Sequence, residues 1–352
     1  MISLSETLAR IHSPDRGLLT RAQERLDRLT KPQGSLGRLE ELAAQYSMIT
    51  GELKPAAPRG AVFTFAADHG VAMEGVSAYP REVTRQMVLN FLRGGAGVNV
   101  LARHAGAEVR VVDIGVAYDF EVAPGLIHKK IMPGTNNFLL GPAMSREQAE
   151  RAVLVGAELA TEAVEGGIGL IGTGDMGIGN TTASSAITAV MTGRPVADVT
   201  GRGTGIDEAA HARKVAVIEQ ALARHRPNRM DAMDVLSKVG GLEIAGLAGL
   251  MLGAAAARVP VVLDGFIAGA AALIAVALQP RCREYLIASH RSVERGHQAL
   301  LDHLHLTPLL DLDLRLGEGT GACLGMSLVV AAVKIMTEMA TFGEAGVSER
   351  DM

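Results

Sequence analysis

The stretch Ile168-Gly169-Leu170-Ile171-Gly172-Thr173-Gly174-Asp175-Met176-Gly177-Ile178-Gly179-Asn180-Thr181-Thr182 decides the fold class that this sequence predicts. Residues 168–171 form a short apolar run, as expected for a buried parallel strand, and residues 183–191 are interpreted as a helix. The glycine loop between them leads from a strand into a helix N-terminus, where exposed N–H groups and the helix dipole attract anions. The pattern favours a phosphate-binding loop over a purely structural turn.

The glycines of this loop also match the dinucleotide fingerprint G-x-G-x-x-G at residues 172–177. By itself this match is weak, and Asp198, about twenty residues further on, lies in a loop context rather than at a clear strand end. An NAD-binding oxidoreductase that uses these glycines remains the alternative enzyme class. No Walker lysine follows the glycines, which argues against a P-loop nucleotidase.

Similar short apolar runs alternate with helical segments along the rest of the chain. The runs interpreted as strands are residues 61–66, 109–114, 127–132, 168–171, 259–263 and 285–288, of which 127–132 is either a strand or an excursion. Most of them end in polar or glycine-rich residues at what should be one edge of the sheet, where open α/β sheets bind ligands. The sequence therefore predicts an α/β fold with a doubly wound, mainly parallel, Rossmann-like sheet.

Composition narrows the function classes. The chain has 352 residues, of which 48% are hydrophobic, enough for one large domain and a smaller one. A net charge of −4 and the lack of Trp argue against nucleic acid and anionic membranes as partners. We expect no signal peptide, because the first residues lack a basic segment followed by an apolar one. We expect no membrane span, because Arg258, Pro260 and Asp264 interrupt the apolar region 242–278. Two isolated cysteines fit a cytoplasmic protein.

A single carboxylate stands out near the carboxyl end, in Leu316-Gly317-Glu318-Gly319-Thr320-Gly321-Ala322, directly before an apolar helical run from 322 to 339. Glycines on both sides allow backbone and ligand to approach closely. The helix start offers free N–H groups and a positive dipole end. Glu318 is therefore well placed to act as a general base, although a first-turn glutamate stabilised by the dipole alone gives the same pattern.

A second glycine loop, residues 201–207, precedes another predicted helix. Asp207 has the position of its N-cap, and Lys214 lies one to two turns into the helix. Lys214 can then reach a phosphate as a point charge, whereas the plainer alternative is a solvated helix lysine.

Other chemistries lack their motifs. The histidines form no H-E-x-x-H and have no matched carboxylate cluster, so we expect no metal. The chain also has no G-x-S-x-G nucleophile elbow. What remains suits the transfer of a phosphosugar, in which the reactants supply nucleophile and leaving group while the protein positions them and moves one proton.

Five motifs, in this order, resemble one family closely: the nicotinate-nucleotide–dimethylbenzimidazole phosphoribosyltransferases, which prepare the lower-ligand nucleotide of cobalamin. The resemblance covers nearly the whole chain. The motifs are Thr30-Lys31-Pro32-Gln33-Gly34-Ser35-Leu36-Gly37, Ala67-Asp68-His69-Gly70-Val71, Gly177-Ile178-Gly179-Asn180-Thr181-Thr182, Leu263-Asp264-Gly265-Phe266 and Leu316-Gly317-Glu318-Gly319-Thr320-Gly321.

This resemblance implies a homodimer, with a large catalytic domain over residues 55–321 and a small helical domain from residues 1–50 and about 322–352. It implies transfer of the 5-phosphoribosyl group of nicotinate mononucleotide to 5,6-dimethylbenzimidazole, giving α-ribazole 5′-phosphate and nicotinate without a cofactor. Glu318 matches the family's general base, which takes the imidazole proton of the benzimidazole.

The resemblance also implies the remaining site residues. Asp175 joins Glu318 as a catalytic candidate, at a position where many members carry Glu. The candidates for binding phosphate and ribose are Gly177, Gly179, Asn180, Thr181, Thr182, Gly203, Lys214 and Ser292. The candidates for binding benzimidazole are Tyr79, Gln86, Met87 and Leu316. Met87 and Leu316 alternatively belong to the core, and a non-catalytic nucleotide sensor of the same fold is a third interpretation.

Overall fold

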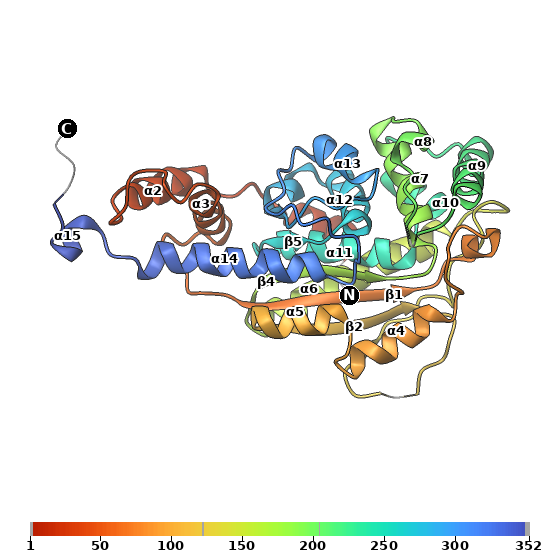
Figure 1. Cartoon of the computed structure of the whole chain (residues 1–352), viewed down its shortest axis with the longest axis horizontal. Helices are drawn as coiled ribbons and strands as arrows, with labels where there is room; N and C mark the ends of the chain where they lie inside the picture. Colours follow the sequence, from red (N-terminus) through yellow and green to blue (C-terminus); the bar gives the residue numbers. More distant parts are fainter. Residues whose placement is uncertain (1–2, 122, 204, 349–352) are drawn as a thin grey trace.

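The computed structural model describes residues 3–121, 123–203 and 205–348. Within these ranges six strands form one parallel sheet in the order β3-β2-β1-β4-β5-β6 (Figure 1). The strands are β1 (Arg59–Ala67), β2 (Ala107–Gly115), β3 (Leu126–His128), β4 (Ile168–Met176), β5 (Val261–Leu263) and β6 (Leu286–Ala288). This order confirms the predicted doubly wound α/β fold, because strands are added first on one side of β1 and then on the other. The direction of winding changes between β1 and β4.

Helices cover both faces of the sheet. The hydrophobic core on one face includes residues of α6 (Arg146–Glu165), α7 (Asn180–Thr192), α10 (Ala232–Val239), α11 (Leu242–Ala256) and α12 (Phe266–Leu278). The core on the other face includes α2 (Arg16–Asp27), α3 (Arg38–Thr50), α4 (Val83–Leu92), α5 (Gly97–Ala105) and α14 (Thr320–Glu338). The other elements are α1 (Leu4–Ala9), η1 (Gly70–Glu74), α8 (Val196–Val199), α9 (Glu208–His225), η2 (Pro280–Tyr285), α13 (His297–Leu304) and α15 (Phe342–Ala345).

Alternation along β1 explains why there are two cores. Phe63 and Phe65 belong to the core that contains α6 and α11, whereas Val62 and Ala66 belong to the core that contains α14. The layer of α6 and α11 is close-packed, since a Cβ at Gly156 would lie 1.9 Å from the carbonyl oxygen of Gly246. β1 is therefore buried on both sides, as expected for a central parallel strand.

The end of β4 differs from the sequence prediction. The strand continues past Ile171 to Met176, because Thr173 and Asp175 still pair with β1. Gly172 and Gly174 therefore lie inside a strand instead of forming a loop at a helix start, so the dinucleotide fingerprint is not formed. Asp198 lies exposed on the short helix α8, away from any strand end. The oxidoreductase alternative has no support in this geometry.

Helices from near the two ends of the chain pack together at one end of the molecule. α2 and α3 lie beside the carboxyl-terminal part of α14 at one end of the molecule (Figure 1), whereas α1 contacts α6 and α11. By length and hydropathy, α14 alone among the described helices could cross a membrane. Within the protein, 56% of its most apolar 18-residue segment is buried, and core helices of soluble proteins pass the same test. The division into two domains stays a prediction.

Candidate active site

A cavity of about 470 Å³ opens at the carboxyl ends of the central strands, where the winding of the sheet changes direction. Its walls come from segments that follow β4, β5 and β6, from α4 and from the turn before α14. It brings together most of the predicted site residues: Tyr79, Met87, Asp175, Gly177, Asn180, Thr181, Gly203, Ser292, Leu316 and Glu318.

Four predicted residues do not line this cavity. Lys214 lies just behind its wall, where Nζ donates a hydrogen bond of 2.7 Å to Oγ1 of Thr181. Gly179 is the N-cap of α7, and Thr182 is fully buried inside that helix. Gln86 is exposed, because α4 presents Val83 and Met87, four residues apart, to the cavity and turns position 86 away.

Glu318 occupies a left-handed turn. Its φ is 64°, between Gly317 at 82° and Gly319 at 106°, a conformation that side chains other than glycine rarely adopt. The turn lies directly on the sheet, since Thr64 Oγ1 of β1 donates a hydrogen bond of 2.9 Å to the Glu318 carbonyl oxygen. A Cβ at Gly174 would lie 2.2 Å from the same oxygen. The glycines around Glu318 are therefore required by this geometry.

The Glu318 side chain does not belong to the first turn of α14. It reaches the start of α5, where the N–H of Val98 donates a hydrogen bond of 3.2 Å to Oε2. The residue is 6% exposed. Burial raises the pKa of Glu318 above its usual 4.5, although the N–H groups of Val98 and Gly97 oppose this shift. A buried carboxylate of raised pKa in a cavity wall has the properties of a general base.

The N–H groups at the start of α14 are already occupied, contrary to the expectation from sequence. Asp264 follows β5 and accepts hydrogen bonds from Gly319 (3.0 Å), Gly321 (2.7 Å) and Ala322 (3.2 Å). Burial raises the pKa of Asp264 to about 7, against the effect of these N–H groups. Asp264 thus holds the turn that carries Glu318, a function that sequence analysis did not identify.

Asp175 lies at the end of β4, next to this turn. Its Oδ2 accepts a hydrogen bond of 2.9 Å from Asn180 Nδ2, and its Oδ1 is buried with no hydrogen-bond partner among the described residues. Burial first, and then the negative charge of Asp264, raise the pKa of Asp175 well above its usual value. Asp175 therefore favours its neutral form over a wider pH range than a solvated aspartate.

Lys214 is a buried cation beside an uncapped helix start. It is 1% exposed and forms no ion pair within the described part of the chain. Burial lowers its pKa from 10.5 to about 8. Gly203 packs against it, since a Cβ there would lie 3.3 Å from Nζ. Among the described residues no side chain caps α7, whose N-cap is Gly179. This combination is typical of an anion site.

Sequence analysis missed several residues of the cavity wall. The polar ones are His290, Glu294 and Arg315, and the others are Val83, Met176, Ile178, Gly265, Phe266, Ile267 and Gly317. For Gly265, Phe266, Ile267 and His290, the position just after β5 or β6 was the available signal, because strand ends meet at the ligand-binding edge. In residues 3–121, 123–203 and 205–348 no group of three or more His, Cys, Asp or Glu side chains could hold a metal ion.

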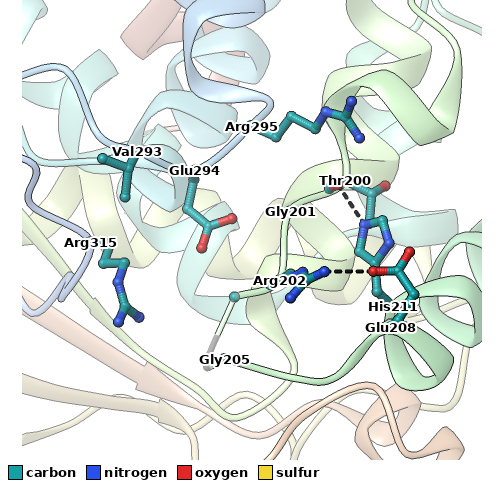
Figure 2. Close-up of a pocket in the computed structure, with 11 residues that line it drawn as sticks. Thr200, Gly201, Arg202, Gly205, Glu208, His211, Val293, Glu294, Arg295 and Arg315 are labelled. Atoms are coloured by element: carbon teal, nitrogen blue, oxygen red, sulfur yellow. Dashed lines mark hydrogen bonds and ion pairs between the residues drawn. The ribbon is translucent and has the colours of Figure 1, made fainter.

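A second cavity of about 470 Å³ adjoins the first and shares Gly203, Glu294 and Arg315 with it (Figure 2). Its other polar groups are engaged by the protein: Arg202 pairs with Glu208, and a His211 ring nitrogen lies 3.0 Å from the Thr200 carbonyl oxygen. We therefore place the chemistry in the first cavity, which contains Glu318.

Comparison with known proteins identifies the family. The chain matches the phosphoribosyltransferase family model over residues 11–347. It is 64% identical over 348 residues to the nicotinate-nucleotide–dimethylbenzimidazole phosphoribosyltransferase of Roseiflexus sp. (strain RS-1), covering 99% of each chain. It is 60% identical over 351 residues to the protein of that name from Geobacter sulfurreducens, covering 100% of each. The crystal structure of CobT from Thermus thermophilus is 51% identical and superposes with a TM-score of 0.91, covering 95% of this chain and 100% of that one. The chain therefore belongs to the nicotinate-nucleotide–dimethylbenzimidazole phosphoribosyltransferase family.

Proposed function

We propose that this protein transfers the 5-phosphoribosyl group of nicotinate mononucleotide to 5,6-dimethylbenzimidazole, giving α-ribazole 5′-phosphate and nicotinate. One observation carries the proposal: a buried carboxylate of raised pKa lines the same cavity as a buried cation's hydrogen-bond partner, Thr181. The first group can remove a proton from a heterocycle, and the second, with Lys214, can hold a phosphosugar beside it.

Glu318 is the general base in this proposal. Its carboxylate takes the N–H proton of the benzimidazole while the other ring nitrogen attacks C1′ of the ribose. The bond from C1′ to the pyridinium nitrogen breaks, and its electron pair stays on that nitrogen as nicotinate leaves. Attack on the face opposite the leaving group converts the β-nucleotide into the α-ribotide. The leaving group is already cationic, so the protein has one proton to move.

The walls of the cavity divide into two sides. Tyr79, Met87 and Leu316 form the side assigned to the flat, apolar benzimidazole. Gly177, Asn180, Thr181 and Gly203 form the side assigned to the phosphate and ribose, with Lys214 behind Thr181, and Ser292 borders it. Gly179 shapes the start of α7, and Asp175 fixes Asn180 through their hydrogen bond.

We also propose that the protein is a cytoplasmic homodimer that needs no cofactor. The dimer follows from the family resemblance. Cys282 and Cys323 are buried as free thiols, as expected in a reducing compartment. Light scattering coupled to size-exclusion chromatography measures the mass, and twice the chain mass is the expected value.

The direct test is to incubate the protein with nicotinate mononucleotide and 5,6-dimethylbenzimidazole and to identify the ribotide and its anomer by NMR. We expect the α-anomer and one nicotinate for each ribotide. Hydrolysis of the donor without transfer, or a β-ribotide, would contradict the proposal. A panel of related azoles in the same assay determines the preferred base.

A further inference from the structure

Five helices in the described part of the chain begin at or beside the substrate cavity. At the start of α4 the N–H groups of Val83 and Thr84 donate to the backbone carbonyl oxygens of Pro80 and Arg81, and protein carboxylates fill two other starts. Glu318 accepts a hydrogen bond from the Val98 N–H at the start of α5, and Asp264 accepts hydrogen bonds from the N–H groups of Gly319 and Gly321 at the start of α14. The other two, α7 and α12, begin at the glycines Gly179 and Gly265, and no side chain caps them. Nicotinate mononucleotide carries two anionic groups, a phosphate and a ring carboxylate. Two unfilled helix starts therefore match the two anions of this donor.

The start of α7 lies beside Lys214 and is the site assigned above to the phosphate. The start of α12 has a different neighbour, His290, which follows β6 and lines the cavity together with Gly265, Phe266 and Ile267. A Cβ at Gly265 would lie 3.6 Å from Nε2 of His290, so this nitrogen faces the helix start. The backbone N–H groups of Phe266 and Ile267 have no acceptor among the described residues.

His290 is a buried polar side chain whose outer nitrogen lacks a partner. The residue is 3% exposed, and within residues 3–121, 123–203 and 205–348 Nε2 accepts and donates no hydrogen bond. Its Nδ1 lies 2.9 Å from Ser289 Oγ, whose alternative acceptor, the carbonyl oxygen of Asp264, is 3.5 Å away. With the Ser289 hydroxyl donating across the shorter contact, Nδ1 is the acceptor and the neutral ring carries its N–H on Nε2. In this tautomer His290 presents a donor to the cavity.

We propose that His290 and the start of α12 bind the carboxylate of the leaving nicotinate and so select nicotinate mononucleotide over nicotinamide mononucleotide. This inference rests on the proposed function. Phe266 and Ile267 supply apolar surface for the pyridine ring next to these donors. An N–H donor together with a helix start favours a carboxylate over a neutral carboxamide, because the helix dipole interacts with net charge.

The test compares the two donors, which share phosphate, ribose and a cationic ring and differ only in carboxylate against carboxamide. We expect His290→Ala to lower kcat/KM for nicotinate mononucleotide about tenfold and to leave the value for nicotinamide mononucleotide nearly unchanged. His290→Gln should restore most of the selectivity, since its amide N–H reaches the position of Nε2. Lys214→Met should weaken both donors in the same proportion. Arg295→Gln, which alters only the adjoining cavity, is the control with unchanged selectivity.

Equal losses with both donors in His290→Ala would overturn the assignment, because they would show a structural role or a phosphate contact. A calorimetric titration separates this result from failure of the proposed function, since it needs no turnover. Wild-type protein should bind nicotinate more tightly than nicotinamide. His290→Ala should lose this difference in affinity, whereas His290→Gln should keep it. Equal binding of both compounds by the wild type refutes the carboxylate subsite even if no ribotide forms.

Discussion

Asp264 Oδ2 lies 3.0 Å from the backbone nitrogen of Gly319, the residue that directly follows Glu318. A carboxylate on one strand end therefore fixes the position of the candidate base on another segment. Asp264→Asn keeps the shape of the side chain but replaces one acceptor oxygen by an amide group, so at least one of its hydrogen bonds to the turn is lost. We expect kcat to fall about 10- to 100-fold with little change in KM. Steady-state kinetics measure both, and an unchanged kcat would show that the turn holds its shape without this contact.

Removal of the base itself should have a larger effect. Glu318→Gln can still accept the hydrogen bond from Val98, so the fold and ligand binding should persist. The amide cannot take a proton, and we expect kcat to fall by about 10²- to 10⁴-fold. Turnover and a calorimetric titration of 5,6-dimethylbenzimidazole test this together. Near-normal turnover with normal binding would rule out Glu318 as the base.

The pH dependence of kcat should report Glu318. Only the deprotonated carboxylate accepts a proton, so activity is lost as pH falls through its pKa. Burial raises this pKa, and the acid limb of the profile should therefore lie above pH 4.5. The residual activity of Glu318→Gln is the control, since its profile should lack this limb. A limb of the same midpoint in both proteins would assign the titration to another group.

Lys214 should lower the stability of the free protein while it promotes donor binding. Burial lowers its pKa from 10.5 to about 8, which corresponds to a cost of about 3 kcal/mol below pH 8 that disappears as pH rises to 10.5. Lys214→Met removes this cost and the hydrogen bond to Thr181, worth about 1 kcal/mol. We expect the free energy of unfolding at pH 7 to rise by about 2 kcal/mol and KM for nicotinate mononucleotide to increase. Denaturant unfolding and kinetics on one preparation test both effects, and a less stable variant would show that the attraction between Lys214 and Glu294 outweighs the cost of burial.

The backbone of Glu318 packs so closely on β4 that no side chain should fit at position 174. A Cβ there meets the Glu318 carbonyl oxygen at 2.2 Å, so Gly174→Ala displaces either the turn or β4. We expect a loss of about 1–3 kcal/mol in unfolding free energy together with reduced kcat. Gly343→Ala in α15 is the matched control, because a Cβ there has no neighbour within 4 Å. Equal stability of the two variants would mean that the turn moves freely.

The sequence predicted those parts of the molecule that depend on local pattern. The apolar run 61–66 identified β1, and Asp207 marked the start of α9 with Lys214 on it, because caps and strand composition are local signals. The end of β4 was misplaced, since pairing with β1 keeps glycines and a buried aspartate within the strand. The contacts of Asp264 with Gly319 and of Glu318 with Val98 join residues 55 and 220 positions apart, and pattern carries no such information. His290 was missed although its place directly after β6, at the ligand-binding edge of the sheet, was an available signal.

The division of the cavity between α4 on one side and the start of α7 on the other bears on how such a protein could diversify. Substitutions at Tyr79, Val83 and Met87 change the wall that faces the benzimidazole and leave the residues that bind the ribotide donor unchanged. The same fold can therefore accept a different base in place of the benzimidazole through substitutions on α4 and in the loop before it. A combinatorial library at these three positions is the natural starting point for new lower ligands.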